Sequence, residues 1–194
     1  MNYLAHAYLS FGQPEIVAGN MISDFVKGKR KFDYAPGIQK GIALHRDIDN
    51  YTDTHAATRD AKEIFRPAYR LYAGAFIDVV YDHFLAIDNN EFTPATLLQF
   101  SETTYNQLAP FMDILPEKFQ QIFPYMRRQN WLYNYQYHQA IARSMAGLVR
   151  RSAYLTESAT AFQLFEDHYA YLQSCYQRFF PDLKNFVIAQ IPLL

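Results

Sequence analysis

The stretch Tyr72-Ala73-Gly74-Ala75-Phe76-Ile77-Asp78-Val79-Val80-Tyr81-Asp82-His83-Phe84-Leu85-Ala86 decides the fold. Its apolar residues recur at helical spacing around most of the cylinder, which is typical of a helix buried on nearly all sides. Two carboxylates, Asp78 and Asp82, lie four residues apart and therefore share one face of this helix. His83 follows directly after the second carboxylate.

The two carboxylates need compensation if the helix is buried. At about 6 Å and an effective dielectric near 20, two carboxylates repel by on the order of 3 kcal/mol. Desolvation adds several kcal/mol for each ion. A divalent metal compensates such a pair economically, because Asp and His are ligands for Mn²⁺, Fe²⁺, Zn²⁺ and Mg²⁺. Arginines and helix caps are the structural alternative, and this helix alone leaves both alternatives open.

The composition indicates one densely packed domain. The chain has 194 residues, of which 50% are hydrophobic, 17% aromatic and 19% charged, which argues against disorder. A net charge of −1 argues against a general nucleic-acid binder. A single cysteine, Cys175, excludes an internal disulfide framework. With no basic leader and no apolar run of membrane-spanning length, we expect a cytoplasmic protein with no membrane partner.

Most helix boundaries are predicted from prolines, which lie at plausible helix starts. We predict about eight helices, roughly 2–10, 14–27, 36–53, 56–65, 67–87, 94–113, 116–150 with a break, and 157–179, followed by a short tail. No linker or internal repeat interrupts this pattern. We therefore predict an all-α single domain, a helical bundle over residues 1–194.

Two earlier segments repeat the polar spacing of the opening stretch. Asn2 and His6 lie four residues apart near the start, and Asn20 and Asp24 do so within an apolar helix for which Gly28 is the expected C-terminal residue. The densest positive cluster of the chain follows: Lys27, Lys29, Arg30 and Lys31. A charge run is usually a solvated face, but the proximity of this one to Asp24 also makes it a candidate docking surface for an anionic partner or a phosphate.

A third segment places His45, Asp49 and Asp53 on one helical stripe, with Arg46 beside it. Read singly, this is also the water-facing side of an amphipathic helix. Read together, three helices each place Asp, Asn or His at i and i+4, and helical bundles build metal sites in this way. Motifs for a nucleophile elbow, a P-loop, a dinucleotide fold, a zinc protease or a Cys-x-x-Cys site are absent from the sequence.

These segments together resemble the acyl carrier protein phosphodiesterase family. The matching motifs are Asn2-x-Leu4-Ala5-His6, Gly19-Asn20-x-x-x-Asp24-Phe25-Val26-x-Gly28, His45-Arg46-x-Ile48-Asp49-x-x-Thr52-Asp53 and Asp78-x-x-x-Asp82-His83-Phe84-Leu85. Downstream, Trp131-Leu132-x-x-Tyr135, Arg150-Arg151 and the stretch from Asp167 to Pro181 are also similar. The family is similar to the HD-type metal-dependent phosphohydrolases, which implies an HD-domain-like bundle. Here the expected His-Asp couple reads His45-Arg46, and an Asp82-His83 couple appears instead.

The resemblance implies hydrolysis of the phosphodiester that joins 4′-phosphopantetheine to a serine of holo-acyl carrier protein, with Mn²⁺ as the metal. On this basis Asp24, Asp78 and Asp82 are expected as metal ligands, with His45 and His83 competing for the imidazole position. Arg46 would neutralise phosphate charge, and Asp49 would orient His45 or the attacking water.

Outside the ligands, His6 and Asn20 are expected as supporting residues. The basic cluster is expected to bind the acidic carrier. Two alternatives remain: a phosphohydrolase of the same fold that acts on a small nucleotide or another phosphodiester, and a non-catalytic helical interaction protein.

Overall fold

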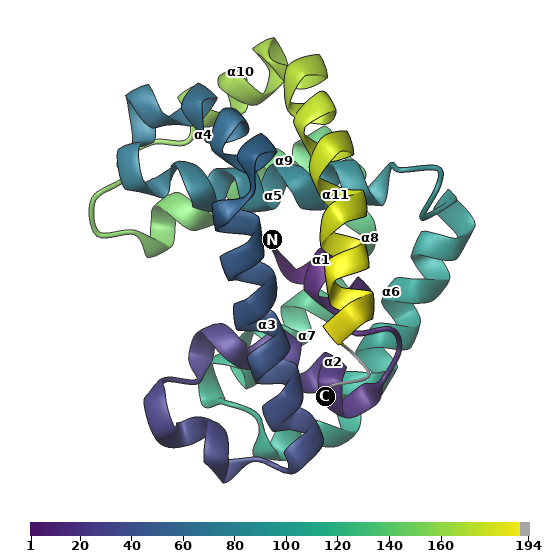
Figure 1. Cartoon of the computed structure of the whole chain (residues 1–194). Helices are drawn as coiled ribbons and strands as arrows, with labels where there is room; N and C mark the ends of the chain where they lie inside the picture. Colours follow the sequence, from purple (N-terminus) through teal and green to yellow (C-terminus); the bar gives the residue numbers. More distant parts are fainter. Residues whose placement is uncertain (191–194) are drawn as a thin grey trace.

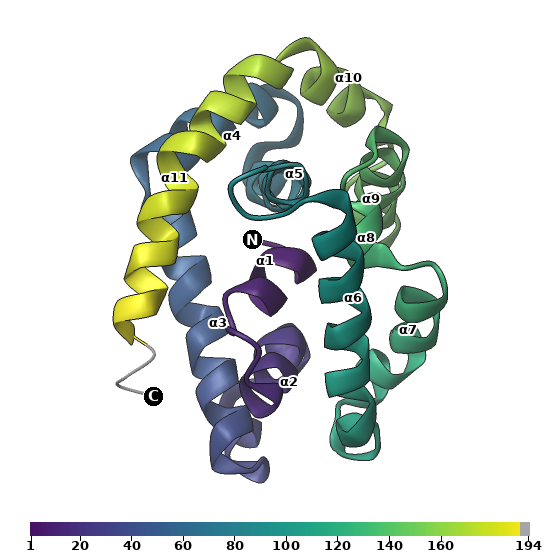
Figure 2. The same cartoon turned by 90° about the vertical axis from the view of Figure 1, so that its right-hand side faces the viewer.

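Helix α5 (Ala73–Ala86) runs through the middle of the computed structural model, which describes residues 1–190. Figure 2 views α5 nearly end-on, with other helices on several sides of it. Helices α1, α4, α9 and α11 all pack against it. Phe76, Ile77 and Val80 expose none of their surface. The prediction of a helix buried on nearly all sides is confirmed.

The described part of the chain is helical with no strand, so the all-α prediction is confirmed (Figure 1). The other α-helices are α1 (Tyr3–Tyr8), α2 (Pro14–Ile22), α3 (Pro36–Thr54), α4 (Ala56–Tyr69), α6 (Pro94–Leu108), α7 (Glu117–Arg128), α8 (Trp131–Asn134), α9 (His138–Arg151), α10 (Ala159–Asp167) and α11 (Tyr169–Gln190). Short 3₁₀ turns join them at η1 (Ser23–Phe25), η2 (Gly28–Asp33), η3 (Arg70–Tyr72) and η4 (Ala109–Ile114).

Several predicted helix boundaries were wrong, and the helix predicted over 157–179 is two helices, α10 and α11. Pro67 does not begin a helix: it lies inside α4, which ends within a turn of it, as expected where a missing N–H weakens the hydrogen-bond ladder. Pro181 lies inside α11, which continues to Gln190 because Leu183 and Val187 are buried beyond the proline. Gly28 is not the C-terminal residue of α2: that helix stops at Ile22, and Gly28 begins η2 with a φ of 57°.

Helices α2 and α3 cross in direct backbone contact at Gly19 and Gly41. A Cβ placed on Gly19 would overlap the carbonyl oxygen of Ile38 and lie 2.8 Å from the amide nitrogen of Ile42. A Cβ on Gly41 would overlap the carbonyl oxygen of Ile16 in the same way. Only glycine fits at either position, and the crossing holds the end of α2 against the middle of α3.

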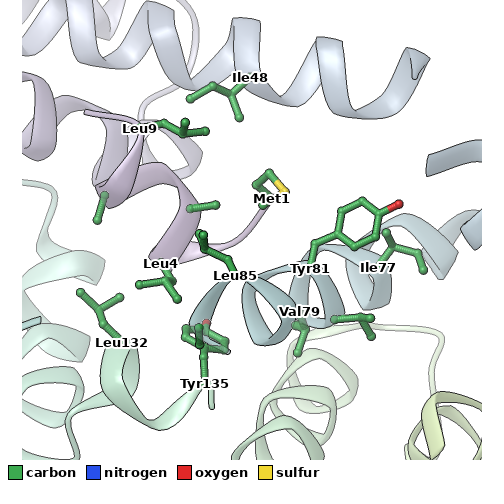
Figure 3. Close-up of a cluster of buried hydrophobic side chains, with 14 of the residues drawn as sticks. Met1, Leu4, Leu9, Ile48, Ile77, Val79, Tyr81, Leu85, Leu132 and Tyr135 are labelled. Carbon is green, nitrogen blue, oxygen red and sulfur yellow. The ribbon is translucent and has the colours of Figure 1, made fainter. Parts of the chain in front are cut away.

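The N-terminus lies inside the molecule, between α5 and α3, in both views (Figures 1 and 2). The close-up in Figure 3 shows the Met1 side chain among Leu85 and Tyr81 of α5, with Ile48 of α3 beyond it. Only 5% of Met1 is exposed. The first turn of α1 is thereby fixed between the central helix and α3, which brings three elements to one point.

Candidate metal centre

Four side chains from three elements meet where α1, η1 and α3 come together: His6 on α1, Asp24 on η1, and His45 and Asp49 on α3. Asp24 therefore follows α2 on a separate 3₁₀ turn and does not lie on the helix that carries Asn20. We call these four residues the His–Asp cluster. Three of them, His6, His45 and Asp49, offer ligand atoms that all lie within 4.8 Å of one another.

The orientation of His45 is fixed by a backbone contact. Its Nδ1 donates a hydrogen bond to the carbonyl oxygen of Asn20 at 2.7 Å, because a carbonyl can only accept. Its Nε2 therefore faces the two carboxylates, 3.3 Å from Asp24 Oδ1 and 3.1 Å from Asp49 Oδ2. Burial by itself would lower the pKa of His45, but these carboxylates raise that pKa to about 9. The electrostatics at Nε2 thus favour a positive charge.

His6 is stacked on His45, with ring centroids 3.8 Å apart and 14° between the planes. Burial and the neighbouring His45 lower the pKa of His6 to about 4, so its ring is neutral at neutral pH. Its Nε2 lies 3.2 Å from Asp49 Oδ1, yet neither ring nitrogen makes a hydrogen bond with any described residue. A buried imidazole that lacks partners and faces a carboxylate has the chemistry of a metal ligand.

The cluster fits a divalent metal. Two imidazoles and two carboxylates form a mixed nitrogen and oxygen donor set suited to Mn²⁺, Fe²⁺ or Zn²⁺. The hydrogen bond from His45 Nδ1 to Asn20 is the kind of outer contact that orients a ligating imidazole. The side chain of Asp24 is 76% exposed and that of Asp49 41% exposed, whereas His6 is buried. The cluster is therefore open to solvent on the side of Asp24 and Asp49.

Asn20 supports this arrangement through both its backbone and its side chain. The Asn20 amide donates to the carbonyl oxygen of His6 at 2.9 Å and to the hydroxyl of Ser10 at 3.1 Å. The backbone carbonyl of Asn20 also accepts a hydrogen bond from His45 Nδ1. Asn20 therefore joins α1, α2 and α3 around the cluster. These contacts hold the three helices together, and the supporting role expected of Asn20 at the site stays a prediction.

Asp82 points away from the cluster, toward the start of α1. Its two oxygens accept backbone N–H bonds from Asn2, Leu4 and Ala5 at 3.1, 2.7 and 3.3 Å. These are the free donors of a helix N-terminus, which an acidic side chain satisfies well. Burial raises the pKa of Asp82 to about 7. In this structure Asp82 acts as a cap supplied by another helix, and its lone pairs do not face the imidazoles.

Asp78 lies next to the cluster and is joined to it by the amino group of Met1. This group donates to Asp78 Oδ1 at 2.8 Å and lies 3.7 Å from Asp49 Oδ1. Burial opposes its charge, but the surrounding carboxylates raise the pKa of the amino group to about 10. An ammonium group thus compensates Asp78 where the sequence predicted a metal.

His83 is separated from the cluster by its own hydrogen bonds. Nδ1 donates to the carbonyl oxygen of Tyr135 at 2.8 Å, and the Tyr169 hydroxyl lies 2.9 Å from Nε2. Burial lowers the pKa of His83 to about 4, so the ring is neutral and Nε2 accepts from Tyr169. Of the two histidines that competed for the imidazole position, only His45 faces the carboxylates.

The cationic residues expected at the site are exposed or partly exposed and follow Asp24 or His45 in the chain. Arg46 is exposed and donates to the carbonyl oxygen of Val26 at 3.1 Å, which holds it beside η1. Lys27, Lys29 and Arg30 are exposed, and Lys31 is partly exposed, in the segment that follows Asp24 through η2. The sequence predicted His6 only as a supporting residue. Its signals were the i,i+4 pair with Asn2 and its place in the motif Asn2-x-Leu4-Ala5-His6, and neither indicates that its ring lies against His45 and Asp49.

The comparison with protein families decides the relationship. The acyl carrier protein phosphodiesterase model matches residues 1–183. The chain belongs to the acyl carrier protein phosphodiesterase family. It is 34% identical over 182 residues to the acyl carrier protein phosphodiesterase of Photorhabdus laumondii, covering 93% of this chain and 92% of that protein. It is 33% identical over 186 residues to that of Yersinia pestis, covering 95% and 96% of the two chains.

A family member from Klebsiella pneumoniae (strain 342) is also 33% identical, over 186 residues. The family resemblance predicted from the sequence motifs is thus confirmed. No solved structure matches this chain. Among residues 1–190, no helix is both long and apolar enough to span a membrane.

Proposed function

We propose that this chain hydrolyses the phosphodiester between 4′-phosphopantetheine and the serine of holo-acyl carrier protein, giving apo-carrier and 4′-phosphopantetheine. Family membership supports the substrate. The observation that carries the chemistry is the buried His6 ring. Neither of its nitrogens has a hydrogen-bond partner among the described residues, Nε2 lies 3.2 Å from Asp49 Oδ1, and the ring is stacked on His45. We also infer that residues 1–194 act as one catalytic domain.

We assign His6, His45, Asp49 and Asp24 as the residues that would hold a divalent metal, with Mn²⁺ as the first metal to test. Such a metal supplies Lewis-acid polarisation of the phosphoryl group and a bound water of lowered pKa. The assignment differs from the sequence expectation in five residues. His6 and Asp49 become ligands. Asp78, Asp82 and His83 take structural roles instead, because their polar atoms already contact the Met1 amino group, the backbone of α1 and Tyr135, respectively.

The remaining residues position and neutralise the substrate. Arg46 uses one N–H on Val26, and the guanidinium has four more donors, a geometry that suits two phosphoryl oxygens. Asp78 holds the Met1 ammonium beside Asp49, which adds positive charge close to where the phosphodiester would lie. Asn20 keeps the His45 ring oriented so that its Nε2 stays directed at the centre.

The decisive experiment incubates holo-acyl carrier protein with the purified protein and Mn²⁺ and follows loss of phosphopantetheine by mass spectrometry. Asp49→Asn should lower kcat strongly, because the interaction lost strengthens in the transition state. Asp47→Asn is the matched control, since Asp47 is exposed on the same helix and has no ion pair among the described residues. Cleavage of small phosphodiesters without cleavage of the holo-carrier would instead favour a general phosphohydrolase.

We further propose that Lys27, Lys29, Arg30 and Lys31 form a landing surface for the acidic carrier. Charge reversal there should mainly lower kcat/KM by weakening encounter, with the largest loss at low salt. The test compares wild type with a Lys29→Glu, Lys31→Glu double variant over a salt titration, on the carrier and on a small phosphodiester. Normal carrier cleavage by the double variant at low salt would show that the carrier docks elsewhere.

A further inference from the structure

A second basic feature lies at the other end of α3 from η2. It is a pocket of about 630 Å³ between the end of α3, helix α4, turn η3 and the start of α5. Its charged lining consists of three cationic side chains and two carboxylates, and Leu71 is its one large apolar side chain: Lys62, Arg66, Arg70, Asp53, Asp78 and Leu71. We call it the α4–α5 pocket. Nothing in the proposed chemistry uses its cations.

The charges of the α4–α5 pocket do not balance internally. Lys62 pairs with Asp53 at 2.7 Å, and the Met1 amino group already compensates Asp78. Arg66 pairs only with the exposed Glu63 on its own helix, a contact that solvent screens. Arg70 has no ion pair with any described residue. The pocket therefore retains positive charge that an anionic partner would neutralise.

The turn that carries Arg70 has an uncommon backbone. Arg70 has φ 48° and ψ −118°, outside the regions that residues other than glycine ordinarily occupy. Its N–H caps α4 by donating to the carbonyl oxygen of Arg66, and the chain then turns so that Leu71 is 98% exposed. A fully exposed leucine that lines the same pocket as two arginines is a candidate contact for a protein partner, because arginine is enriched at interface cores and a partner would bury the apolar surface of the leucine.

The pocket lies beside the His–Asp cluster. Asp78 lines the pocket and contacts the Met1 amino group, which in turn lies 3.7 Å from Asp49. Helix α3 runs from η2 at its lower end to α4 at its upper end in Figure 1, and it carries His45 and Asp49 between them. Nineteen helical residues span about 28 Å, so the two basic features flank the cluster at a separation that one small protein domain could bridge.

We propose that the α4–α5 pocket and Leu71 form a second docking contact for the acidic carrier protein, on the opposite side of the cluster from η2. Arg66 and Arg70 pair with carboxylates of the carrier, and Leu71 packs into an apolar depression on it. A partner held at both ends of α3 presents its phosphodiester to the residues in the middle. This inference rests on the proposed function for the identity of the partner.

The test uses two variants and matched controls. Arg66→Glu with Arg70→Glu reverses the charge at the pocket, and Lys118→Glu with Arg128→Glu makes the same change on exposed positions of α7. Leu71→Ser removes the anchor, and Ile114→Ser is its control, because Ile114 is also an exposed apolar residue, at 56%. Thermal melts of every variant establish that it is folded.

Two measurements follow. One is the fluorescence anisotropy of labelled holo-carrier titrated with metal-free protein at low salt. The other is kcat/KM for the carrier relative to kcat/KM for a small phosphodiester. We expect the Arg66→Glu, Arg70→Glu variant to have roughly tenfold lower affinity for the carrier and a roughly tenfold lower ratio of the two kcat/KM values. Both losses should shrink at high salt. We expect Leu71→Ser to lower them about fivefold without salt dependence. The controls should stay within about twofold of wild type.

The outcomes separate the inference from the function on which it rests. If wild type cleaves the carrier and both variants match the controls, the docking contact is refuted while the proposed function stands. If the variants instead weaken inhibition by free 4′-phosphopantetheine to the same extent, the pocket holds the pantetheine arm and the protein contact is refuted. If wild type neither binds nor cleaves the carrier, the proposed function itself has failed.

Discussion

The glycine pair at the crossing of α2 and α3 offers the sharpest test of the fold. Alanine favours a helix over glycine by about 0.8–1.0 kcal/mol, so helix propensity alone predicts that Gly41→Ala stabilises the protein. The structure predicts the opposite. The new Cβ would overlap the carbonyl oxygen of Ile16 and lie 2.9 Å from the amide nitrogen of Asn20. Both are backbone atoms of another helix, and neither can rotate away.

The magnitude follows from the distance that the helices must separate. Ordinary contacts between carbon and a backbone polar atom are about 3.3–3.6 Å, so α2 and α3 must move apart by about 1 Å. Overpacking of this kind costs typically 1–3 kcal/mol, and a rigid neighbour places the cost at the upper end. Subtracting the propensity gain leaves a net loss of about 2 kcal/mol. For a chain of this size we expect the melting temperature to fall by about 4–8 °C.

The matched control is Gly147→Ala, in the interior of α9. There the nearest atom to a new Cβ is Nη1 of Arg151, at 3.3 Å, the end of a flexible side chain. The gain in helix propensity should therefore exceed the cost of the contact with Arg151. We expect the variant to be as stable as wild type, or more stable by up to about 1 kcal/mol. Urea unfolding followed by circular dichroism measures both changes. Equal or greater stability of Gly41→Ala would refute the close backbone crossing.

Three further predictions concern the metal, the cap and the buried histidine. Mn²⁺ at a hundredfold excess over its Kd should raise the free energy of unfolding by about 2.7 kcal/mol relative to chelator, and Asp49→Asn should abolish this difference. Asp82→Ala should cost about 2 kcal/mol in urea unfolding, because three backbone donors of α1 lose their acceptor; Asp82→Asn keeps one oxygen and should cost less. As pH falls from 6.5 to about 4, wild type should lose stability relative to His83→Gln. Burial lowers the pKa of His83 in the folded protein to about 4, so the unfolded chain binds the proton first. The free energy of unfolding should fall by about 1.4 kcal/mol per pH unit, or roughly 3 kcal/mol in all.

Each of these predictions has a contrary outcome. Identical melts with Mn²⁺ and with chelator would argue that the His–Asp cluster is an ion-pair network and binds no metal. If Asp82→Ala does not lower the free energy of unfolding, water or another group can accept the hydrogen bonds from the first N–H groups of α1. A difference between wild type and His83→Gln that does not change with pH would mean that His83 titrates alike in the folded and unfolded chain.

The sequence by itself determined the helical architecture, the buried position of α5 and the family motifs, because helical periodicity and local motif spacing are properties of short stretches. It also identified the helix carrying His45 and Asp49 as one that presents ionisable groups on a single face. These inferences needed no knowledge of neighbouring elements. They stood because a residue's face on a helix is set by its spacing along the chain.

Only the tertiary structure decided which polar faces meet. Asp78 and Asp82 share the spacing of a ligand pair, yet one contacts the Met1 amino group and the other caps α1. His6 reaches His45 because Gly19 and Gly41 allow α2 and α3 into backbone contact, with Asn20 joining α1 to both. Spacing specifies the direction of a side chain from its own helix axis; what lies opposite depends on how separate helices pack, and that is fixed by contacts distant in sequence.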